Sequence, residues 1–427
     1  MQLGSPGRLA TSLFAATAAL LGAPTGPSAA EEAKRPWTFD TSLLFYGESQ
    51  RVSDLSANVR AQHGLGSGLL TLRLTVDSLT GASASGAVPS RFPQTFTTPS
   101  GNGSYQAGPG ATPLDTSFLD TRVAFGANWL RSVGTRGELD FGLSGSKEYD
   151  YLHTGANARY SLAFDQRNTT LGIGLAFASD TVDPVGGAPV GLTPMRAAGQ
   201  PAGKLGSDSK RVTDLLLGVT QVLGPRTVGE LSYSFSRSDG YLTDPYKVLT
   251  VVDPATGDPV PGPDLPYLYL FEDRPDSRTK HSLYAQVKHR FGRPVADASY
   301  RYMTDDWGVT SHTLEMHWRQ PIGPRWFVQP HLRYYVQSAA DFYRPFLVSG
   351  QPLPDHASAD YRLGELDAAT LGVKVGRALA HDREVSLRVE YYRPSGRAPP
   401  LSAFGAPTGL DIDPAVDAVI TQLAFRF

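Results

Sequence analysis

Apolar and polar residues alternate one by one along most of this chain. The clearest segment runs from Leu70 to Asp77, where leucine and valine occupy the even positions and threonine, arginine and aspartate the odd ones. A period of two predicts a β-strand with one apolar face and one polar face. The same alternation recurs from Trp37 to the last residue, and helical periodicity is almost absent. The pattern therefore predicts an all-β fold.

Sixteen segments of this kind reach about 9–11 residues or more, the length that a tilted strand needs to cross a membrane. They are residues 37–48, 54–63, 68–78, 117–131, 136–150, 153–166, 168–179, 210–222, 227–238, 279–291, 295–305, 308–320, 325–338, 366–378, 383–393 and 415–427. Tight turns connect them on one side, and the long connections on the other side are residues 79–116, 180–209, 239–278, 339–365 and 394–414. A soluble sandwich or propeller would not place its long loops on one side. The sequence therefore predicts a transmembrane antiparallel up-and-down β-barrel of about 16 strands, with short periplasmic turns and long extracellular loops.

The last segment, Val416 to Phe427, alternates in the same way and ends on a phenylalanine. On a soluble protein, such an apolar terminal strand would invite association. The ending resembles that of bacterial outer-membrane barrels, whose final strand typically closes on Phe and is read by the assembly machinery. We therefore expect the barrel-assembly machinery to bind Phe427, and the apolar strand faces to contact outer-membrane lipid.

Composition narrows the class of protein further. The 427 residues carry a net charge of −2 and 19% charged residues, so no nucleic-acid partner is indicated. The chain has no cysteine, which excludes disulfides and thiolate metal sites and suits export through the periplasm. Residues 1–30 are predicted to be a signal peptide, with Arg8 in its basic region and Leu9 to Leu21 as its apolar core, which leaves 31–427 as the outer-membrane barrel. No cofactor is expected.

Several short motifs stand out from the strand pattern. They are DSLTGAS at 77–83, SKEYDY at 146–151 (SxEYDY), YLTDPYK at 241–247, EDRPD at 272–276, YRYMTDDW at 300–307 (YRYxxDDW) and RYYVQSAADFY at 333–343. In combination they resemble an uncharacterised family of Gram-negative outer-membrane barrels, a domain of unknown function, over essentially the whole mature chain. The resemblance implies an outer-membrane location, but it implies no activity and no catalytic residue.

In this topology the motifs collect at the outer ends of the strands and predict a rim of charges and aromatic rings. The charged residues are Asp77, Glu148, Asp150, Asp244, Asp273, Arg274, Asp276, Arg301, Asp305, Asp306, Arg333 and Asp341. The aromatic residues are Tyr151, Tyr246, Tyr300, Trp307, Tyr335 and Tyr343. Such a rim can be a constriction or vestibule that selects a solute, a Ca²⁺ site between carboxylates, or a set of ion pairs that locks inward-folded loops. The lock and the constriction are compatible, because a loop tied inward narrows the lumen.

The predicted lumen face carries two further patterns. Inward charges on the first nine strands are mostly acidic, as at Asp140, whereas those on the later strands are mostly basic, as at Arg388. Walls of opposite sign would orient polar solutes, although any water-filled lumen needs charge. Glu315 and His317 point inward beside His331 of the next strand. This trio can bind Zn²⁺, but such residues more often hydrogen-bond to their neighbours in a lumen, and we assign no metal site.

The expected function is passive transport of small polar solutes, as a porin-like channel or as the outer-membrane component of a transport or export system. Two alternatives stay open: a plugged barrel with a structural or surface-binding role, and a lipid-modifying outer-membrane enzyme. Ser311 and His312 are adjacent in a strand and so point to opposite faces. The chain also has no GxSxG, HExxH or phosphate-loop motif. We therefore predict that the protein is not an enzyme.

Overall fold

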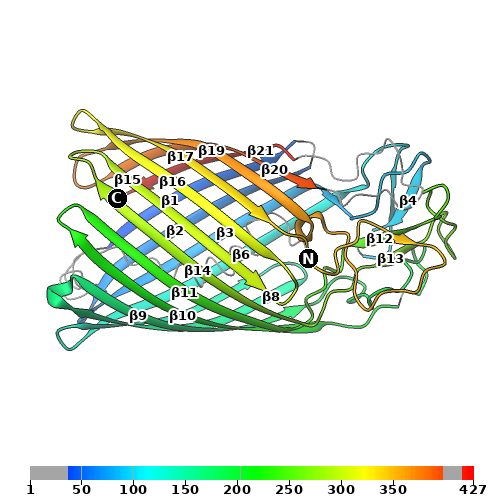
Figure 1. The fold of residues 1–427 in the computed structure, drawn as a ribbon, viewed down its shortest axis with the longest axis horizontal. Coiled ribbons are helices and arrows are strands. Elements are labelled where there is room, and N and C mark those ends of the chain that lie inside the picture. The colour runs from blue at the N-terminus through cyan, green and yellow to red at the C-terminus, as the bar shows by residue number, and fades with distance from the viewer. Residues whose placement is uncertain (1–36, 50, 99, 202, 398–415) are drawn as a thin grey trace.

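The computed structural model describes residues 37–49, 51–98, 100–201, 203–397 and 416–427, and strands dominate it. Sixteen of the strands close into one antiparallel barrel, in which each pairs with the next along the chain and the last pairs with the first (Figure 1). The barrel strands are β1 (Thr38–Glu48), β2 (Val52–Leu65), β3 (Gly68–Ala84), β6 (Leu114–Val133), β7 (Gly137–Lys147), β8 (Tyr151–Phe164), β9 (Thr169–Val182), β10 (Asp208–Gly224), β11 (Thr227–Gly240), β14 (Ser277–Arg290), β15 (Val295–Asp305), β16 (Thr310–Ile322), β17 (Trp326–Gln337), β19 (Glu365–Ala378), β20 (Glu384–Arg397) and β21 (Ala418–Arg426). The predicted fold class and strand number are confirmed.

The alternation of the sequence becomes the two faces of the wall. On β3, Leu74 and Val76 are exposed on the outside of the barrel, whereas Thr71 and Asp77 are buried on the inside. The same division holds around the ring, where the exposed large hydrophobic residues of the strands, chiefly leucines, valines and aromatics, lie on the outer face. A shift of one residue in any strand would exchange the two faces, and the hydrophobic pattern therefore specifies the register strongly.

The two ends of the barrel differ as predicted. One end carries only tight connections, for example two residues between β2 and β3 and two between β10 and β11. The other end carries the long connections, which form the right-hand part of Figure 1. The predicted signal peptide (1–30) and most of the last long connection (398–415) lie outside the described residues.

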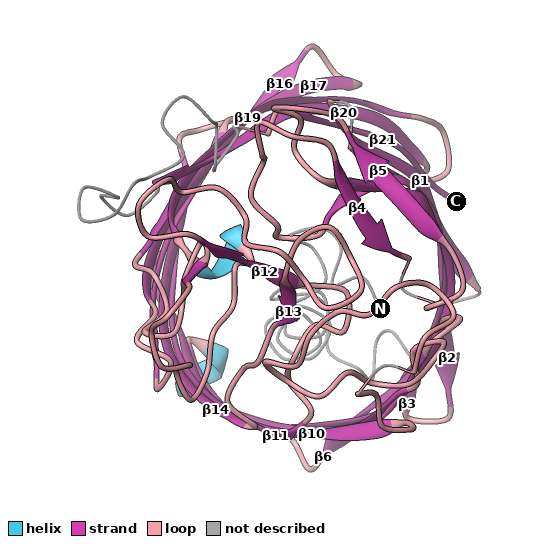
Figure 2. Ribbon diagram, turned by 90° about the vertical axis from the view of Figure 1, so that its right-hand side faces the viewer, coloured by secondary structure: helices cyan, strands magenta, loops and turns pink. Residues whose placement is uncertain are grey.

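Four of the long connections contain structure that the alternation did not predict. Their described residues fall within 85–113, 183–207, 241–276 and 338–364, which we call the cap. They form β4 (Gln94–Thr97) paired with β5 (Ser104–Ala107), and a second sheet in which β12 (Val248–Val252) lies between β13 (Tyr269–Phe271) and β18 (Leu347–Val348). The short 3₁₀-helix η2 (Tyr361–Leu363) also lies in the cap, and η1 (Asp165–Arg167) lies in a turn at the other end. Viewed along the barrel, cap segments cross in front of the lumen (Figure 2).

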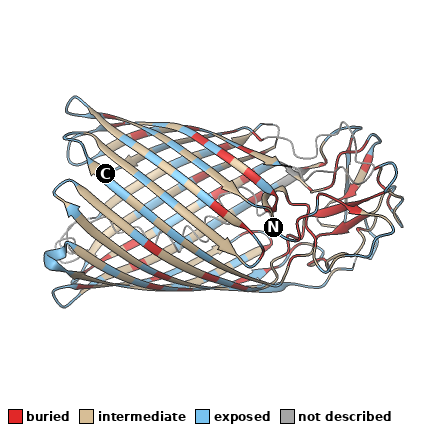
Figure 3. Ribbon diagram, in the orientation of Figure 1, coloured by how far each residue is buried: buried red, intermediate tan, exposed pale blue. Residues whose placement is uncertain are grey.

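The cap has hydrophobic cores of its own. One of them packs Phe96 from the first loop, Met195 from the second and Tyr269 from the third. Another packs Leu249 of the third loop against Leu347 of the fourth. Burying one such side chain contributes about 1.5–3 kcal/mol, so these clusters hold four separate loops together as one body. Figure 3 shows the buried residues concentrated in this part of the molecule.

The described residues include two 3₁₀-helices of three residues each and no helix with the length and hydropathy of a membrane span.

Candidate functional site: the cap and the lumen

Five charged residues of the cap form a cluster that we call the buried ion network. Arg274 lies at its centre: its Nε is 2.6 Å from Oε1 of Glu272, and its Nη2 donates to Oδ2 of Asp360 at 2.9 Å. Arg362 donates through Nε to Oδ1 of Asp360 at 2.8 Å and through Nη2 to Oδ2 of Asp244 at 3.3 Å. The side chains of Arg274, Glu272 and Asp360 are at most 3% exposed, so the ion pairs lie away from water.

The pKa values in and beside this network are shifted because its charged groups are buried away from water and lie close to one another. Burial alone would raise the pKa of Asp360, but Arg362 and Arg274 outweigh it and hold that pKa well below its usual range. Burial raises the pKa of Glu272 in spite of Arg274 beside it. Burial lowers the pKa of the neighbouring Lys247, whose Nζ donates to the backbone carbonyl of Ala84 at the end of β3. The charges therefore depend on one another, and the removal of one leaves others buried without compensation.

Two of the predicted rim residues, Asp244 and Arg274, belong to this network. Three more take part in ion pairs nearby. Asp77 accepts from Nε of Arg122 at 2.6 Å on the lumen face, and Asp305 accepts from Nε of Arg278 at 2.8 Å.

The third of these pairs joins two loops of the cap. In it, Asp273 lies 2.6 Å from Nδ1 of His356. Five of the twelve rim charges that the sequence predicts are thus partners in ion pairs of the structure.

The tight turn between β7 and β8 supplies two further predicted residues, Glu148 and Asp150. Both are buried, and together with Asp120 of β6 they bring three carboxylates within 4.8 Å of one another. The hydroxyl of Tyr246 in the cap donates to Asp150, which ties the cap to this turn. Tyr151, at the start of β8, donates to Asp180. Oxygen ligands at this spacing are the kind that Ca²⁺ takes.

The remaining rim residues are not gathered at one place. Arg301 and Arg333 point into the lumen from β15 and β17, and Arg301 lies 5.4 Å from the ring centre of Tyr284. Tyr335 also points inward and donates to Gln337 at 2.6 Å. Trp307, in the short turn between β15 and β16, and Tyr343, in the cap, are buried in one hydrophobic core. Asp306 of the same turn is exposed, as are Asp276 and Asp341 of the cap.

The placement of Tyr300 in the vestibule was wrong. It lies on the outer face of β15, where its hydroxyl is 2.6 Å from Nδ1 of His312 on β16. The reason is the strand period: Tyr300 and Arg301 are neighbours in one strand, so they must point to opposite faces. Within the strand, alternate residues of this motif therefore lie on the outer face and on the lumen face.

The lumen wall is lined by polar side chains that bond across neighbouring strands. Nη1 of Arg73 donates to Oδ1 of Asn128 at 2.7 Å, and Nδ2 of Asn128 donates to Oδ1 of Asp140 at 3.0 Å. Nε of Arg426 on the last strand donates to Oδ1 of Asp40 on the first at 2.6 Å, which closes the ring. The inward placement predicted for Asp140 is thus confirmed, and part of the charge on each wall is paired locally.

The inward trio of the later strands does converge. Glu315, His317 and His331 each bring one donor atom within 4.8 Å of the other two. Oε1 of Glu315 is 3.4 Å from Nε2 of His331 and 3.8 Å from Nε2 of His317. The two imidazole rings are parallel within 2°, with centres 4.2 Å apart. Nδ1 of His331 is 2.8 Å from Oε1 of Glu390 on β20.

Sequence reasoning missed several residues of these sites. His153 points inward from β8 and lies 2.7 Å from Oδ1 of Asp180, and the period of its strand could have revealed it. Glu272 lies in the EDRPD motif and Lys247 in the YLTDPYK motif, but the sequence predicts a role in the rim only for other residues of these motifs. Asp360 lies in a loop without any periodic pattern, so no signal marked it.

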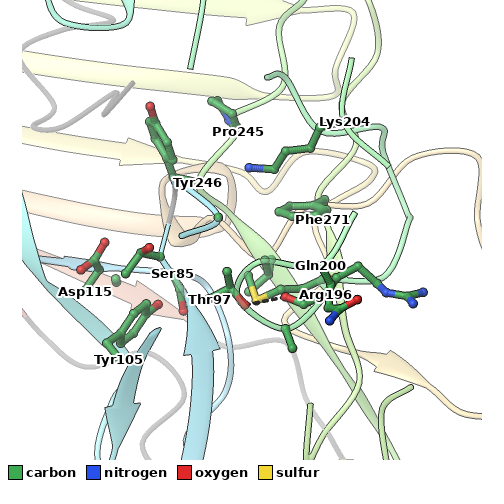
Figure 4. A pocket seen from close by; sticks show the side chains of 16 residues that line it. Ser85, Thr97, Tyr105, Asp115, Arg196, Gln200, Lys204, Pro245, Tyr246 and Phe271 are labelled. Atoms are coloured by element: carbon green, nitrogen blue, oxygen red, sulfur yellow. Dashed lines mark hydrogen bonds between the residues drawn. The ribbon is translucent and has the colours of Figure 1, made fainter. Parts of the chain in front are cut away.

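Residues of the cap and of the ends of β3 and β6 line a small cavity of about 50 Å³ (Figure 4). Its lining includes Tyr105, Met195 and Phe271, and Nζ of Lys204 lies 5.7 Å from the ring centre of Phe271. The volume is enough for a few water molecules.

Comparison with known proteins gives a family and a fold. No curated protein matches the chain. Among solved structures, the ferric enterobactin receptor PfeA in complex with BCV-L6 is 9% identical, with a TM-score of 0.44, over 86% of this chain and 56% of that one. CdiB from Acinetobacter baumannii is 10% identical, with a TM-score of 0.44, over 91% of this chain and 60% of that one. The CymD monoaromatic hydrocarbon channel is 9% identical, with a TM-score of 0.38, over 91% and 87%.

The chain thus spans little more than half the length of the first two of these proteins, and similarity at this level carries no conclusion about function. The family model described as "Protein of unknown function (DUF3570)" matches residues 10–427, which is nearly the whole sequence. The protein therefore belongs to the DUF3570 family, and its fold is a 16-stranded barrel of the outer-membrane type.

Proposed function

We propose that the protein is a porin-like channel of the bacterial outer membrane, through which small polar solutes diffuse without a chemical step. The observation that carries the proposal is the two-faced wall. Its outer face is a continuous apolar surface that includes Leu143, Leu314 and Leu371, and its inner face is lined by charged and amide side chains. An apolar exterior around a polar interior suits a barrel with lipid outside and water inside. At this strand number a barrel interior is wide enough for an aqueous path.

In this proposal the cap is the selective element on the external side. Its segments cross the mouth of the lumen, and the buried ion network holds the third and fourth cap loops against each other. Lys247, which neighbours the network, bonds to the backbone at the end of β3 and so fixes this part of the cap to the wall. A cap fixed in this way leaves only narrow routes for solutes, so we expect low conductance and discrimination by size and charge.

Single-channel recording on the refolded mature protein in planar lipid bilayers tests the proposal. We expect small current steps that scale with salt concentration. In Arg274→Met, which removes the centre of the ion network, the steps should become larger or more frequent. Arg91→Met is the matched control, because it removes an exposed ion pair with Asp258 in the same cap.

The result that would overturn the channel is silence from both the unmodified protein and Arg274→Met, with both variants correctly folded. That result would support the plugged barrel, for which the hydrophobic cores of the cap are the main argument. Steps seen only in Arg274→Met would support a channel that the cap closes. Equal steps in all three proteins would mean that the cap does not restrict the path.

A further inference from the structure

We propose that Glu315, His317 and His331 bind a divalent transition-metal ion on the lumen wall, with Glu390 orienting His331. The four residues lie near the middle of β16, β17 and β20, whereas the buried ion network lies in the cap. The proposal does not depend on whether the barrel conducts, because it rests on the geometry of these side chains alone.

The spacing of the donor atoms fits a metal ion. Zn²⁺ bonds of about 2.0–2.1 Å in a tetrahedron place neighbouring donor atoms roughly 3.3 Å apart. In the structure Oε1 of Glu315 lies 3.4 Å from Nε2 of His331 and 3.8 Å from Nε2 of His317. All three donor atoms fall within 4.8 Å of one another, so an ion can bind between them after small side-chain rotations.

Glu390 completes the arrangement that metal-binding histidines usually have. Its Oε1 lies 2.8 Å from Nδ1 of His331, and because a carboxylate only accepts, this nitrogen donates. In the neutral imidazole Nε2 then keeps its lone pair for a metal. Nε2 of His331 is buried and makes no hydrogen bond, although it faces the carboxylate of Glu315. A lone pair that faces a carboxylate is unfavourable, so either a proton on Nε2 or a metal ion between the two groups is needed.

The strands around the cluster carry a residue that makes room for this contact. Gly372 of β19 lies between His331 and Glu390 in the pairing. A Cβ at this position would lie 2.5 Å from Cγ of Glu390, so any other residue would push the carboxylate away. Glycine weakens a strand, and its presence here is explained by the close approach of Glu390.

Pro330 is a second residue that weakens a strand, and it lies directly beside His331. The pairing of β16 with β17 runs to His317 opposite His331 and resumes only at Gln320 opposite Val328. Proline has no amide hydrogen for the ladder, which accounts for the gap. Two departures from good strand sequence therefore adjoin one cluster, and such departures are typical of functional sites.

A protonated His331 between two glutamates is the alternative explanation of the cluster. A protonated imidazole carries a hydrogen on both ring nitrogens, so it accounts for Glu390 at Nδ1 and for Glu315 at Nε2. It gives no reason for His317 to lie parallel to His331 with its Nε2 directed to the same carboxylate. A divalent ion accounts for all three donors at once, because it binds them simultaneously.

The neighbouring charges indicate which class of ion would bind. Arg388 lies 3.4 Å from Oε2 of Glu390, and Arg333 is opposite Glu315 in the strand register. These arginines offset the carboxylate charge, which disfavours Ca²⁺ and Mg²⁺, since they depend on oxygen ligands. Two imidazoles and one carboxylate suit Zn²⁺ and other first-row transition metals, and three protein ligands leave a position for water or a solute group.

Titration of the metal-free, refolded mature protein with Zn²⁺ in detergent tests this inference, and visible absorption after addition of Co²⁺ reports the ligand geometry. We expect one ion per barrel. His317→Gln and His331→Gln should each abolish the tight site, and Glu390→Gln should weaken it by about 10–100-fold, as expected for a residue that orients a ligand. Gly372→Ala should weaken it too, because the new Cβ displaces Glu390.

His153→Gln is the matched control, since His153 also points into the lumen beside one carboxylate, but that carboxylate bonds to Lys210 as well. It should leave the stoichiometry and affinity unchanged. Heat-modifiable migration on gels shows whether each variant still forms the barrel. The inference is overturned if folded wild-type protein binds no Zn²⁺, or if it binds Zn²⁺ as tightly as the folded double variant His317→Gln/His331→Gln.

Discussion

The barrel wall and the cap differ in how their charged residues are stabilised. In the wall, charged residues such as Asp140, which accepts from Asn128 of the adjacent strand, line the lumen. In the cap, Glu272, Arg274 and Asp360 lie almost completely out of water, and they are compensated only by one another. The wall therefore tolerates the loss of single polar groups, whereas the cap depends on a complete set.

This difference shows that different features of the sequence determine the structure of the two regions. The wall is specified by a repeated pattern, because its residues alternate between an apolar outer face and a polar inner face. The cap has no such repeat, and its loops are joined by a few contacts between residues far apart in the sequence, such as the bond of Arg274 to Asp360. Mutations can test this comparison, and the effects below are ordered from the largest to the smallest.

The largest effect is expected from Arg274→Met. It leaves Glu272 and Asp360 buried without their shared cation, and breaking a buried pair in this way costs about 3–5 kcal/mol. The cap should open locally while the barrel stays intact. Limited proteolysis in detergent should then cleave the four cap loops much faster than in the wild type, while the barrel fragments stay paired.

The control for this prediction lies in the same cap. Arg91 makes a bidentate contact with Asp258, but at the surface, where such pairs contribute little. Arg91→Met should therefore leave the cleavage rate nearly unchanged. Equal acceleration in both variants would show that burial does not distinguish the two pairs, and the comparison between wall and cap would lose its basis.

The next effect concerns the two faces of the wall. Leu332 lies on the outer face of β17, and Gln329 lies on the inner face of the same strand. Leu332→Arg should lower the free energy of unfolding by about 2–4 kcal/mol in lipid vesicles, because it places a charge in hydrocarbon. Gln329→Arg should change it little, because it places the same charge in the lumen.

Denaturant unfolding in vesicles, followed by tryptophan fluorescence, measures both variants. A large loss for Gln329→Arg together with none for Leu332→Arg would mean that the faces are assigned the wrong way round. Similar small losses for both would mean that the outer face does not contact lipid.

The wall could be predicted from the sequence almost completely. The residue range of β15 agrees at both ends, and the inward positions of His317 and His331 follow from strand parity alone. The predicted strands ended early in places, as on β3, which continues to Ala84. There the ladder continues by backbone hydrogen bonds after the apolar pattern stops, and a pattern of side chains cannot reveal that.

The cap could not be predicted, for a physical reason. Its strands have two to five residues, which is too short for a period of two to be recognised. The partner of Arg274 lies 86 residues further along the chain, and no local spacing connects the two. Motifs identified Asp244 and Arg274 as important, but Asp360 and Arg362, which complete the network, had no signal. The prediction for Tyr300 is wrong because the motif as a whole indicates one location, whereas neighbouring residues of a strand point to opposite faces.

The smallest effect is expected from the charges of the lumen wall, where the sequence predicts an acidic side and a basic side. Asp140→Asn should lower the preference for cations, and Arg388→Gln should raise it. A unit charge about 4 Å from an ion in water contributes about 1 kcal/mol, and salt screens it further, so each permeability ratio should change by at most roughly fivefold.

Reversal potentials in asymmetric salt measure both variants. A chelator is present because a metal ion near Glu390 would add charge to the basic side. Shifts in the opposite sense for the two variants would support walls of opposite sign. Unchanged selectivity in both would mean that local pairs, such as Asn128 with Asp140, already cancel the field that the sequence pattern suggests.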